Sequence, residues 1–153
     1  MDQYIALKTD YEKNINLYDS YCREIINQIS HQLKEKAITI GFPLEYRVKK
    51  WESLIQKRQT QKLGIEKVSD LKDFAGVRII VLFKNDIERV HEIINNTFKI
   101  EEYEEKSQAD DRFGYSSIHY SIAIKDSWKE IATLKQFQNL KCEIQLRTAA
   151  QHI

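Results

Sequence analysis

The chain of 153 residues has few cysteines, and Cys22 and Cys142 are the only two. They lie far apart in the sequence and form no C-x-x-C pair, which argues against structural zinc and favours a reduced protein. No apolar run reaches the length of a membrane span, and residues 1–6 lack the basic and apolar parts of a signal peptide. We therefore expect a cytoplasmic protein that makes no contact with a membrane.

The chain also lacks a strong net charge, because 24 basic residues nearly balance 23 acidic ones. An overall attraction to nucleic acid or to a membrane surface is therefore excluded, and any charge that binds a ligand must be gathered locally. The phosphate loop G-x-x-x-x-G-K-[ST] and the nucleophile motif G-x-S-x-G are both absent from the sequence. These absences exclude a P-loop enzyme and leave no motif for a covalent nucleophile.

The spacing of apolar residues predicts a mixture of helices and strands. The expected elements are a helical segment at 2–38, a strand at 44–49, a helix at 50–63, a short helical turn at 69–73, a strand at 76–83 that is buried on both faces, a helix at 85–96, an edge strand at 98–106, a strand at 114–124, a partly helical connection at 126–139 and a strand at 142–148. This order indicates an α/β (α+β) fold, with flanking helices on a mixed β-sheet of about five strands.

The length of the chain indicates a single domain. We expect a helical N-terminal segment over residues 1–40 and a catalytic core over residues 44–153. Thr148 is expected to cap a further helix, and the last residue, Ile153, falls within its first turns. We therefore expect the domain to be truncated at its C-terminus.

The strand expected at 142–148 has one polar face. Glu143, Gln145 and Arg147 alternate with apolar residues, so their side chains point the same way, about 7 Å apart from one to the next. Taken alone, this pattern is explained better by a solvated strand face than by a functional site. Three other segments of the sequence favour a functional site instead.

A basic segment follows the first expected strand. Arg47 and Lys49 share one face of that strand, and Ser53 and Lys57 share one side of the next helix. A guanidinium, ammonium groups and a hydroxyl that converge within about ten residues can hold a polyphosphate. A solvated basic helix explains the same residues, so the segment alone does not decide between the two interpretations.

Two carboxylates are candidates for a metal site. Asp73 lies just before the strand at 76–83, and Glu143 is the only acidic residue of the strand at 142–148. Carboxylates from two strands beside a polyphosphate site are typical of Mg²⁺ held between protein and substrate phosphates. Each carboxylate by itself is explained equally well as a surface charge.

An aromatic side chain and an imidazole share a face of the strand at 114–124. Tyr115 follows Gly114, where a ligand can approach the backbone closely, and His119 lies four residues further along the same face. Such a pair suits a stacked base and a hydrogen-bonded sugar or phosphate. A buried tyrosine and a hydrogen-bonded core histidine explain the pattern equally well.

These four segments, in this order and followed by Gln151 and His152, resemble the synthetase domain of the RelA/SpoT alarmone synthetases. The segments are 47–57, 73–79, 114–120 and 143–148. The resemblance implies a nucleotidyltransferase-like mixed sheet. It also implies a GTP diphosphokinase type of activity, in which the β,γ-diphosphate of ATP passes to the 3′-hydroxyl of GDP or GTP, giving (p)ppGpp and AMP.

The resemblance implies a role for each candidate residue. The donor side consists of four residues that would hold ATP and two carboxylates that would bind Mg²⁺ and serve catalysis: Arg47, Lys49, Ser53 and Lys57, then Asp73 and Glu143. Glu143 would complete the Mg²⁺ site or take the proton from the attacking hydroxyl. The acceptor side consists of a stacking aromatic, an imidazole near the phosphates or ribose, and two supporting side chains: Tyr115, His119, Gln145 and Arg147.

The sequence departs from the family at two places. Phe113 stands where many long members have Asn, which weakens the expectation of base contacts there. A second arginine that flanks the adenine in some members has no evident match, and Lys84 and Arg89 are the candidates for its place.

The resemblance leaves the acceptor and the partners open. Some small toxic relatives transfer pyrophosphate to the 3′ end of tRNA, so tRNA is an alternative acceptor, and a nucleotide-sensing module without catalysis is a second alternative. An antitoxin or a regulatory domain as partner, and a homo-oligomer, are also compatible with the sequence.

Overall fold

A mixed β-sheet organises the computed structural model, which describes residues 2–61, 64–107 and 116–149. Within these ranges the helices and strands are α1 (Asp2–Glu35), β1 (Glu45–Val48), α2 (Trp51–Thr60), β2 (Ala75–Val81), α3 (Asp86–Thr97), β3 (Lys99–Ser107), β4 (Ser116–Ala123) and β5 (Cys142–Thr148). Three short 3₁₀ helices, η1 (Val68–Asp70), η2 (Asp126–Glu130) and η3 (Lys135–Phe137), lie in the connections between them.

The strands of these described ranges form one five-stranded sheet in the order β1-β2-β5-β4-β3. The central strands β2 and β5 are parallel, and the other neighbours are antiparallel. The mixed sheet with flanking helices and a helical N-terminal segment confirms the fold class predicted from the sequence. The chain order gives no hint that β5 lies between β2 and β4, because that pairing depends on contacts between distant residues.

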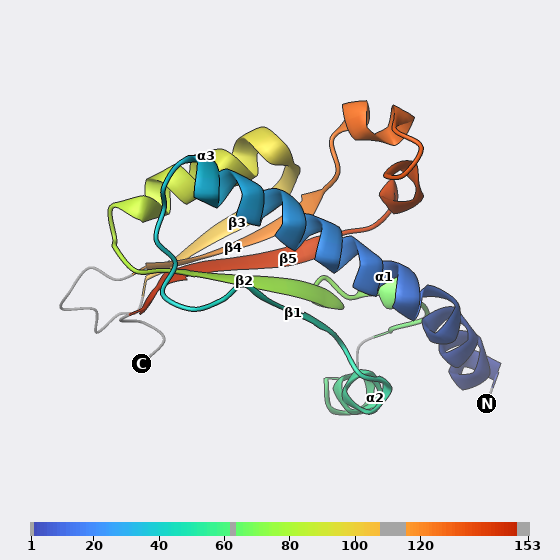
Figure 1. Cartoon of the computed structure of the whole chain (residues 1–153). Coiled ribbons are helices and arrows are strands. Elements are labelled where there is room, and N and C mark those ends of the chain that lie inside the picture. Colours follow the sequence, from blue (N-terminus) through green and yellow to red (C-terminus); the bar gives the residue numbers. More distant parts are fainter. Residues whose placement is uncertain (1, 62–63, 108–115, 150–153) are drawn as a thin grey trace.

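Helices α1 and α3 lie together on one side of the sheet (Figure 1). Along α1, apolar residues recur every three or four positions, and Tyr18, Cys22, Ile25 and Ile29 are buried against the sheet. Tyr21 on the same helix is fully buried as well. Burial of this apolar stripe stabilises the helix, since a long helix gains most of its stability from tertiary packing.

The strand register assigns alternate residues to the two faces of the sheet. Val77, Ile144 and Tyr120 lie side by side, point toward the helices and are buried. Two rows cross the opposite face from β1 to β4: Arg47, Gly76, Glu143 and Ser121 form one, and Glu45, Arg78, Gln145 and His119 form the other. The face away from α1 and α3 is therefore lined with groups that can bind a polar ligand.

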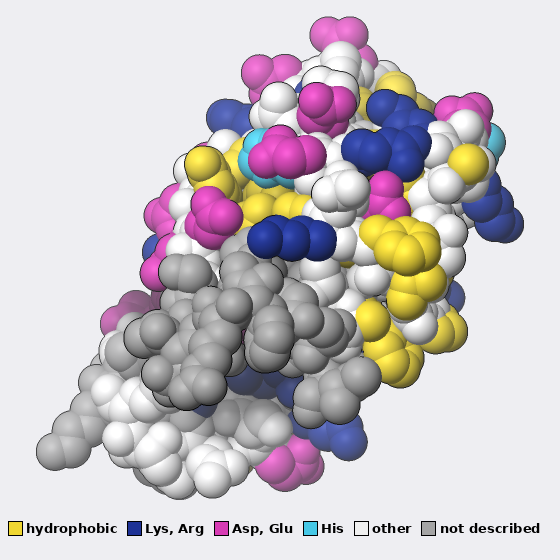
Figure 2. Space-filling view, turned by 90° about the vertical axis from the view of Figure 1, so that its left-hand side faces the viewer, with side chains coloured by type: hydrophobic (Ala, Val, Ile, Leu, Met, Phe, Trp, Pro, Cys, Tyr) yellow, Lys and Arg dark blue, Asp and Glu magenta, His cyan; other side chains and the backbone are white. Residues whose placement is uncertain are grey.

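Charges of both signs are mixed on the surface. On the face shown in Figure 2, acidic and basic side chains are interspersed with each other and with hydrophobic side chains, as the net charge of +1 suggests. Of the helices in the described part of the chain, none combines the length and the apolarity needed to cross a bilayer.

Candidate active site

Asp73 is held by two lysines at the start of β2. Lys57 on α2 donates from Nζ to Asp73 Oδ1 at 2.9 Å, and Lys49 Nζ lies 3.4 Å from Asp73 Oδ2. The backbone N–H of Lys49 donates to the carbonyl of Phe74 at 2.8 Å, which holds the end of β1 against the start of β2. Three residues predicted from two separate segments thus meet at one end of the sheet.

The charge of Asp73 is maintained in this cluster. Burial raises the pKa of the Asp73 carboxyl, but the hydrogen bond from Lys57 and the charge of Lys49 outweigh burial, so its pKa lies below the ordinary value. The side chains of Lys49 and Lys57 are only 12% and 22% exposed. The cluster therefore combines an ionised carboxylate with two partly desolvated ammonium groups. An anionic ligand can take the place of the Asp73 carboxylate beside these two ammonium groups.

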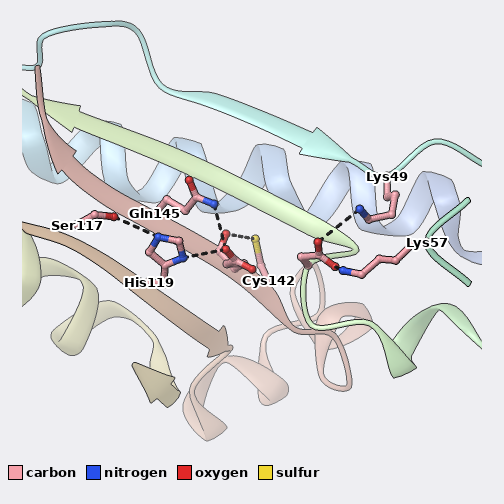
Figure 3. A network of polar contacts seen from close by, with 8 residues as sticks. Lys49, Lys57, Ser117, His119, Cys142 and Gln145 are labelled. Atoms are coloured by element: carbon pink, nitrogen blue, oxygen red, sulfur yellow. Dashed lines mark hydrogen bonds and ion pairs between the residues drawn. The ribbon is translucent and has the colours of Figure 1, made fainter. Parts of the chain in front are cut away.

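Glu143 on β5 is the centre of a second cluster. Gln145 Nε2 donates to Glu143 Oε1 at 3.1 Å, and His119 Nδ1 on β4 lies 3.4 Å from the same oxygen. Nε2 of His119 is 3.1 Å from the Ser117 hydroxyl. Figure 3 shows His119 and Gln145 turned toward a common carboxylate, and Lys49 and Lys57 turned toward another at the far end of the network.

The two ring nitrogens of His119 face different partners. Nδ1 of His119 faces the Glu143 carboxylate at 3.4 Å, and Nε2 faces the Ser117 hydroxyl at 3.1 Å. Which of these groups donates depends on which ring nitrogen carries the proton. His119 and Gln145 together hold the Glu143 carboxylate in one orientation.

Two pockets meet at Glu143. The β1–β2 pocket has a volume of about 210 Å³, and Glu45, Arg47, Gly76 and Arg78 are among its lining residues. The β3–β4 pocket has a volume of about 340 Å³, and its lining includes Lys72, Glu102, Glu104, Lys106, His119 and Ser121. Glu143 lines both pockets, so its carboxylate can contact two ligands bound side by side on the open face.

The other predicted site residues are not part of these clusters. Ser53 is exposed on α2 and lines neither pocket. Arg147 lies on the open face of β5, also lines neither pocket, and its Nε is buried without a hydrogen-bond partner in the described part of the chain. Tyr115 and Phe113 lie outside the described residues, as do Gln151 and His152.

A second arginine lies beside Arg47 on the open face of the sheet. Arg78 lines the β1–β2 pocket together with Arg47, whereas Arg89 on α3 donates to Asp86 at 3.0 Å and to the carbonyl of Lys36. Lys84 is exposed after β2 and lines neither pocket. Neither candidate for the second arginine lines a pocket in the described part of the chain, and the residue beside the adenine stays a prediction.

Sequence reasoning missed Arg78 and Glu45 for the same reason. We interpreted the strand at 76–83 as buried on both faces, because β-branched residues dominate it. Only one of its faces is covered by helices, and the Arg78 side chain is 33% exposed on the other. The alternation of Gly76 and Arg78 with Val77 was the signal that pointed to an open face.

Comparison with known proteins agrees with this fold. Residues 46–153 match the family model described as a region found in RelA / SpoT proteins. Over 159 residues the chain is 26% identical to GTP pyrophosphokinase YwaC of Bacillus subtilis (strain 168), and the match covers 98% of this chain and 73% of that protein. The chain is 25% identical to GTP pyrophosphokinase YjbM of the same organism over 115 residues, which cover 72% of this chain and 52% of YjbM.

Solved structures with the same fold are known. Small alarmone synthetase 2 from Bacillus subtilis superposes with a TM-score of 0.74 at 25% identity, covering 94% of this chain and 74% of that one. Small alarmone synthetase 1 from the same organism, bound to its product pppGpp, superposes with a TM-score of 0.71 at 23% identity, covering 93% and 74% of the two chains. Since the family model matches more than half of the sequence, the chain belongs to the RelA/SpoT family.

Proposed function

We propose that this protein transfers the β,γ-diphosphate of ATP to the 3′-hydroxyl of GDP or GTP, making (p)ppGpp and releasing AMP. The observation that carries the proposal is the position of Glu143, which lines both pockets. A transfer between two nucleotides needs such a group between a donor site and an acceptor site. Support comes from two relatives named GTP pyrophosphokinase and from a solved relative bound to pppGpp.

The donor nucleotide binds across the β1 side of the open face. Arg47 and Arg78 line the β1–β2 pocket and take the nucleoside, while Lys49 and Lys57 take the phosphates in exchange for Asp73. Ser53 lies one helical turn before Lys57 and adds a hydroxyl donor to the phosphate site. A solved relative bound to AMPCPP, an analogue of ATP, supports the use of this donor.

The carboxylates suit a magnesium ion that arrives with the substrate. In the described part of the chain no three His, Cys, Asp or Glu side chains form a cluster that could hold a metal by themselves. Mg²⁺ is commonly bound by one or two carboxylates together with substrate phosphates, and Asp73 and Glu143 provide this type of ligand. The ion would neutralise charge on the transferring phosphates.

The chemistry requires little covalent work from the protein. The acceptor 3′-oxygen forms a bond to the β-phosphorus of ATP, the bond from that phosphorus to the α,β-bridging oxygen breaks, and AMP leaves. Glu143 accepts the proton of the attacking hydroxyl, and His119 and Gln145 keep its carboxylate oriented. Tyr115, His119, Gln145 and Arg147 are the predicted contacts of the acceptor. Of these, His119 lines the β3–β4 pocket, and Gln145 lies between the two substrates at the β1–β2 pocket. The positively charged groups position both substrates.

The β3–β4 pocket is where the acceptor nucleotide is proposed to bind. Its lining combines two carboxylates of β3 with two lysines: Glu102 and Glu104, and Lys72 and Lys106. Lys72 is paired with Glu102 at 2.8 Å. Because this lining is mixed in charge, it attracts and repels phosphates alike, and the transfer assay identifies the acceptor.

The proposal is tested by incubating the protein with γ-labelled ATP, Mg²⁺ and GDP, GTP or deacylated tRNA. We expect label in GDP and GTP and none in tRNA. A Glu143→Gln variant should lose the transfer, whereas Glu105→Gln, a matched change outside both pockets, should keep it. Label in tRNA alone, or ATP binding with no labelled acceptor, would overturn the proposal in favour of a tRNA-modifying enzyme or a nucleotide-sensing module.

A further inference from the structure

The floor of the β1–β2 pocket is formed by a residue without a side chain. Gly76 lies between Arg47 and Glu143 in one row of the sheet. Among the described residues, a Cβ added to Gly76 would meet only the Glu143 carbonyl oxygen, at 3.7 Å, which is an ordinary van der Waals contact. The packing of the protein therefore does not demand glycine here. A glycine inside a strand commonly marks a place where a ligand comes close to the backbone.

The walls of this pocket suit a flat aromatic ligand. Arg47 and Arg78 reach it from neighbouring strands, and a planar guanidinium stacks well on a ring. Arg78 has a buried Nε with no hydrogen-bond partner in the described part of the chain. A purine that lies on the backbone at Gly76 would be placed between these groups.

The edge of the pocket carries a carboxylate. Glu45 lines the pocket and is paired through one oxygen with Nη2 of Arg78, its neighbour in the sheet register. Its side chain is 56% exposed, so the carboxylate has further positions at which it can accept hydrogen bonds. A carboxylate cannot donate, and it therefore distinguishes a purine with an amino group from one with a carbonyl group at the same position.

We propose that Glu45 selects the base of the donor nucleotide, by accepting a hydrogen bond from the 6-amino group of adenine and repelling the 6-carbonyl of guanine or hypoxanthine. Adenine presents a donor at this position and guanine an acceptor. The inference rests on the proposed function, in which the β1–β2 pocket holds the donor. A hydrogen bond to a charged group corresponds to a preference for ATP of about tenfold to hundredfold.

The test measures nucleotide binding without any transfer. A fluorescent ATP analogue with an N-methylanthraniloyl group on the ribose is bound to the protein with Mg²⁺, and ATP or ITP is added to displace it. ITP carries the carbonyl and lacks the amino group. We expect wild-type protein to require at least about tenfold more ITP than ATP, and Glu45→Gln to require less than about threefold more, because an amide can both donate and accept.

The matched control is Glu101→Gln, another ion-paired glutamate on an edge strand, which lines neither pocket and should keep the wild-type ratio. If Glu45→Gln keeps the wild-type ratio of ITP to ATP needed for displacement, the inference is overturned, even if both nucleotides bind more weakly. Glu45 would then only orient Arg78. Equal displacement by ATP and ITP in the wild type would overturn it too. Protein that binds the analogue selectively but labels no acceptor refutes the proposed function alone.

The floor is tested separately with Gly76→Ala. The added methyl group has room in the protein, so the melting temperature should stay within about 2 °C of the wild type. The affinities for ATP and ITP should both fall about tenfold or more, because the base can no longer lie against the strand. Unchanged affinity for both nucleotides would show that nothing lies against Gly76 and would overturn this placement of the base.

Discussion

Glu143 is the residue on which the proposed chemistry depends most. Its carboxylate is oriented by Gln145 and His119 and lines the pockets proposed for both substrates. An isolated carboxylate on a strand face would rotate freely among several orientations. A hydrogen bond from Gln145 and the contact with His119 on the next strand restrict it, which is what a proton acceptor in a transfer between bound substrates requires.

A Glu143→Gln change should lower kcat for transfer to GDP by about 10²- to 10⁴-fold, because the amide has the same shape but cannot take a proton. The affinity for ATP should change by less than about tenfold, since the amide still contributes an oxygen to the site. The measurement is initial transfer rate at saturating substrates, together with displacement of the fluorescent ATP analogue. A variant that retains half of the wild-type rate would contradict the role of Glu143.

At the residue scale, part of the candidate site could be predicted from the sequence. Residue type and spacing predicted Lys49 and Lys57 for a polyphosphate site and Asp73 for a metal site beside it, and the structure brings these three side chains together. They also placed Glu143 and Gln145 on one face, which the structure confirms. Glu45 and Arg78 were missed, because whether a strand has one open face depends on which helices cover the sheet. The roles of Ser53 and Arg147 stay predictions.

At the scale of elements, the first turns of α1 hold the segment that carries the phosphate site. The Tyr11 hydroxyl donates to the carbonyl of Lys49 at 2.9 Å. The Trp51 ring, at the start of α2, lies 5.4 Å from the Tyr11 ring and 5.5 Å from the Tyr4 ring in edge-to-face contacts. Lys8 lies over the same indole at 5.0 Å. These contacts connect α1 to the junction of β1 and α2, from which Lys49 extends.

A Tyr11→Phe change should therefore raise the KM for ATP by about threefold to tenfold, because the backbone at Lys49 loses one anchoring hydrogen bond worth about 1 kcal/mol. The kcat should change by less than about twofold, since Tyr11 touches no reacting group. Tyr4→Phe is the control, because it keeps the ring beside Trp51 and leaves Lys49 untouched. An unchanged KM for ATP in Tyr11→Phe would show that α1 only covers the core.

At the scale of the whole molecule, the two faces of the sheet have different roles. One face packs against helices and stabilises the fold, and the other carries the candidate binding site. The face under α1 and α3 buries tyrosine side chains together with the aliphatic core, whereas both pockets open on the other face. Alternating apolar residues predicted the strands, and apolar residues every three or four positions predicted the buried face of α1. The strand order β1-β2-β5-β4-β3 could not be predicted, because it depends on pairing between residues far apart in the chain. The proposed division between residues 1–40 and 44–153 stays a prediction.

The buried tyrosines make the whole molecule sensitive to alkali. Burial raises the pKa of Tyr18 from 10.0 to about 12, while the unfolded chain keeps the ordinary value. The neutral phenol thus contributes stability that is fully present below pH 10 and is lost as the pH rises toward about 12. The free energy of unfolding should fall over this range, and more gently in Tyr18→Phe. Urea titrations at several pH values measure how steeply the free energy of unfolding falls with pH in the wild type and in Tyr18→Phe. Equal pH dependence in the two proteins would contradict the raised pKa of Tyr18.

The central claim, a transfer of pyrophosphate from ATP to a guanine nucleotide, is tested most directly by the products. ATP and GDP are incubated with the protein and Mg²⁺, and the nucleotides are separated and quantified by anion-exchange chromatography over time. We expect AMP and a guanosine tetraphosphate to appear together in equal amounts and at equal rates. Formation of ADP or free pyrophosphate, with no tetraphosphate, would contradict the claim.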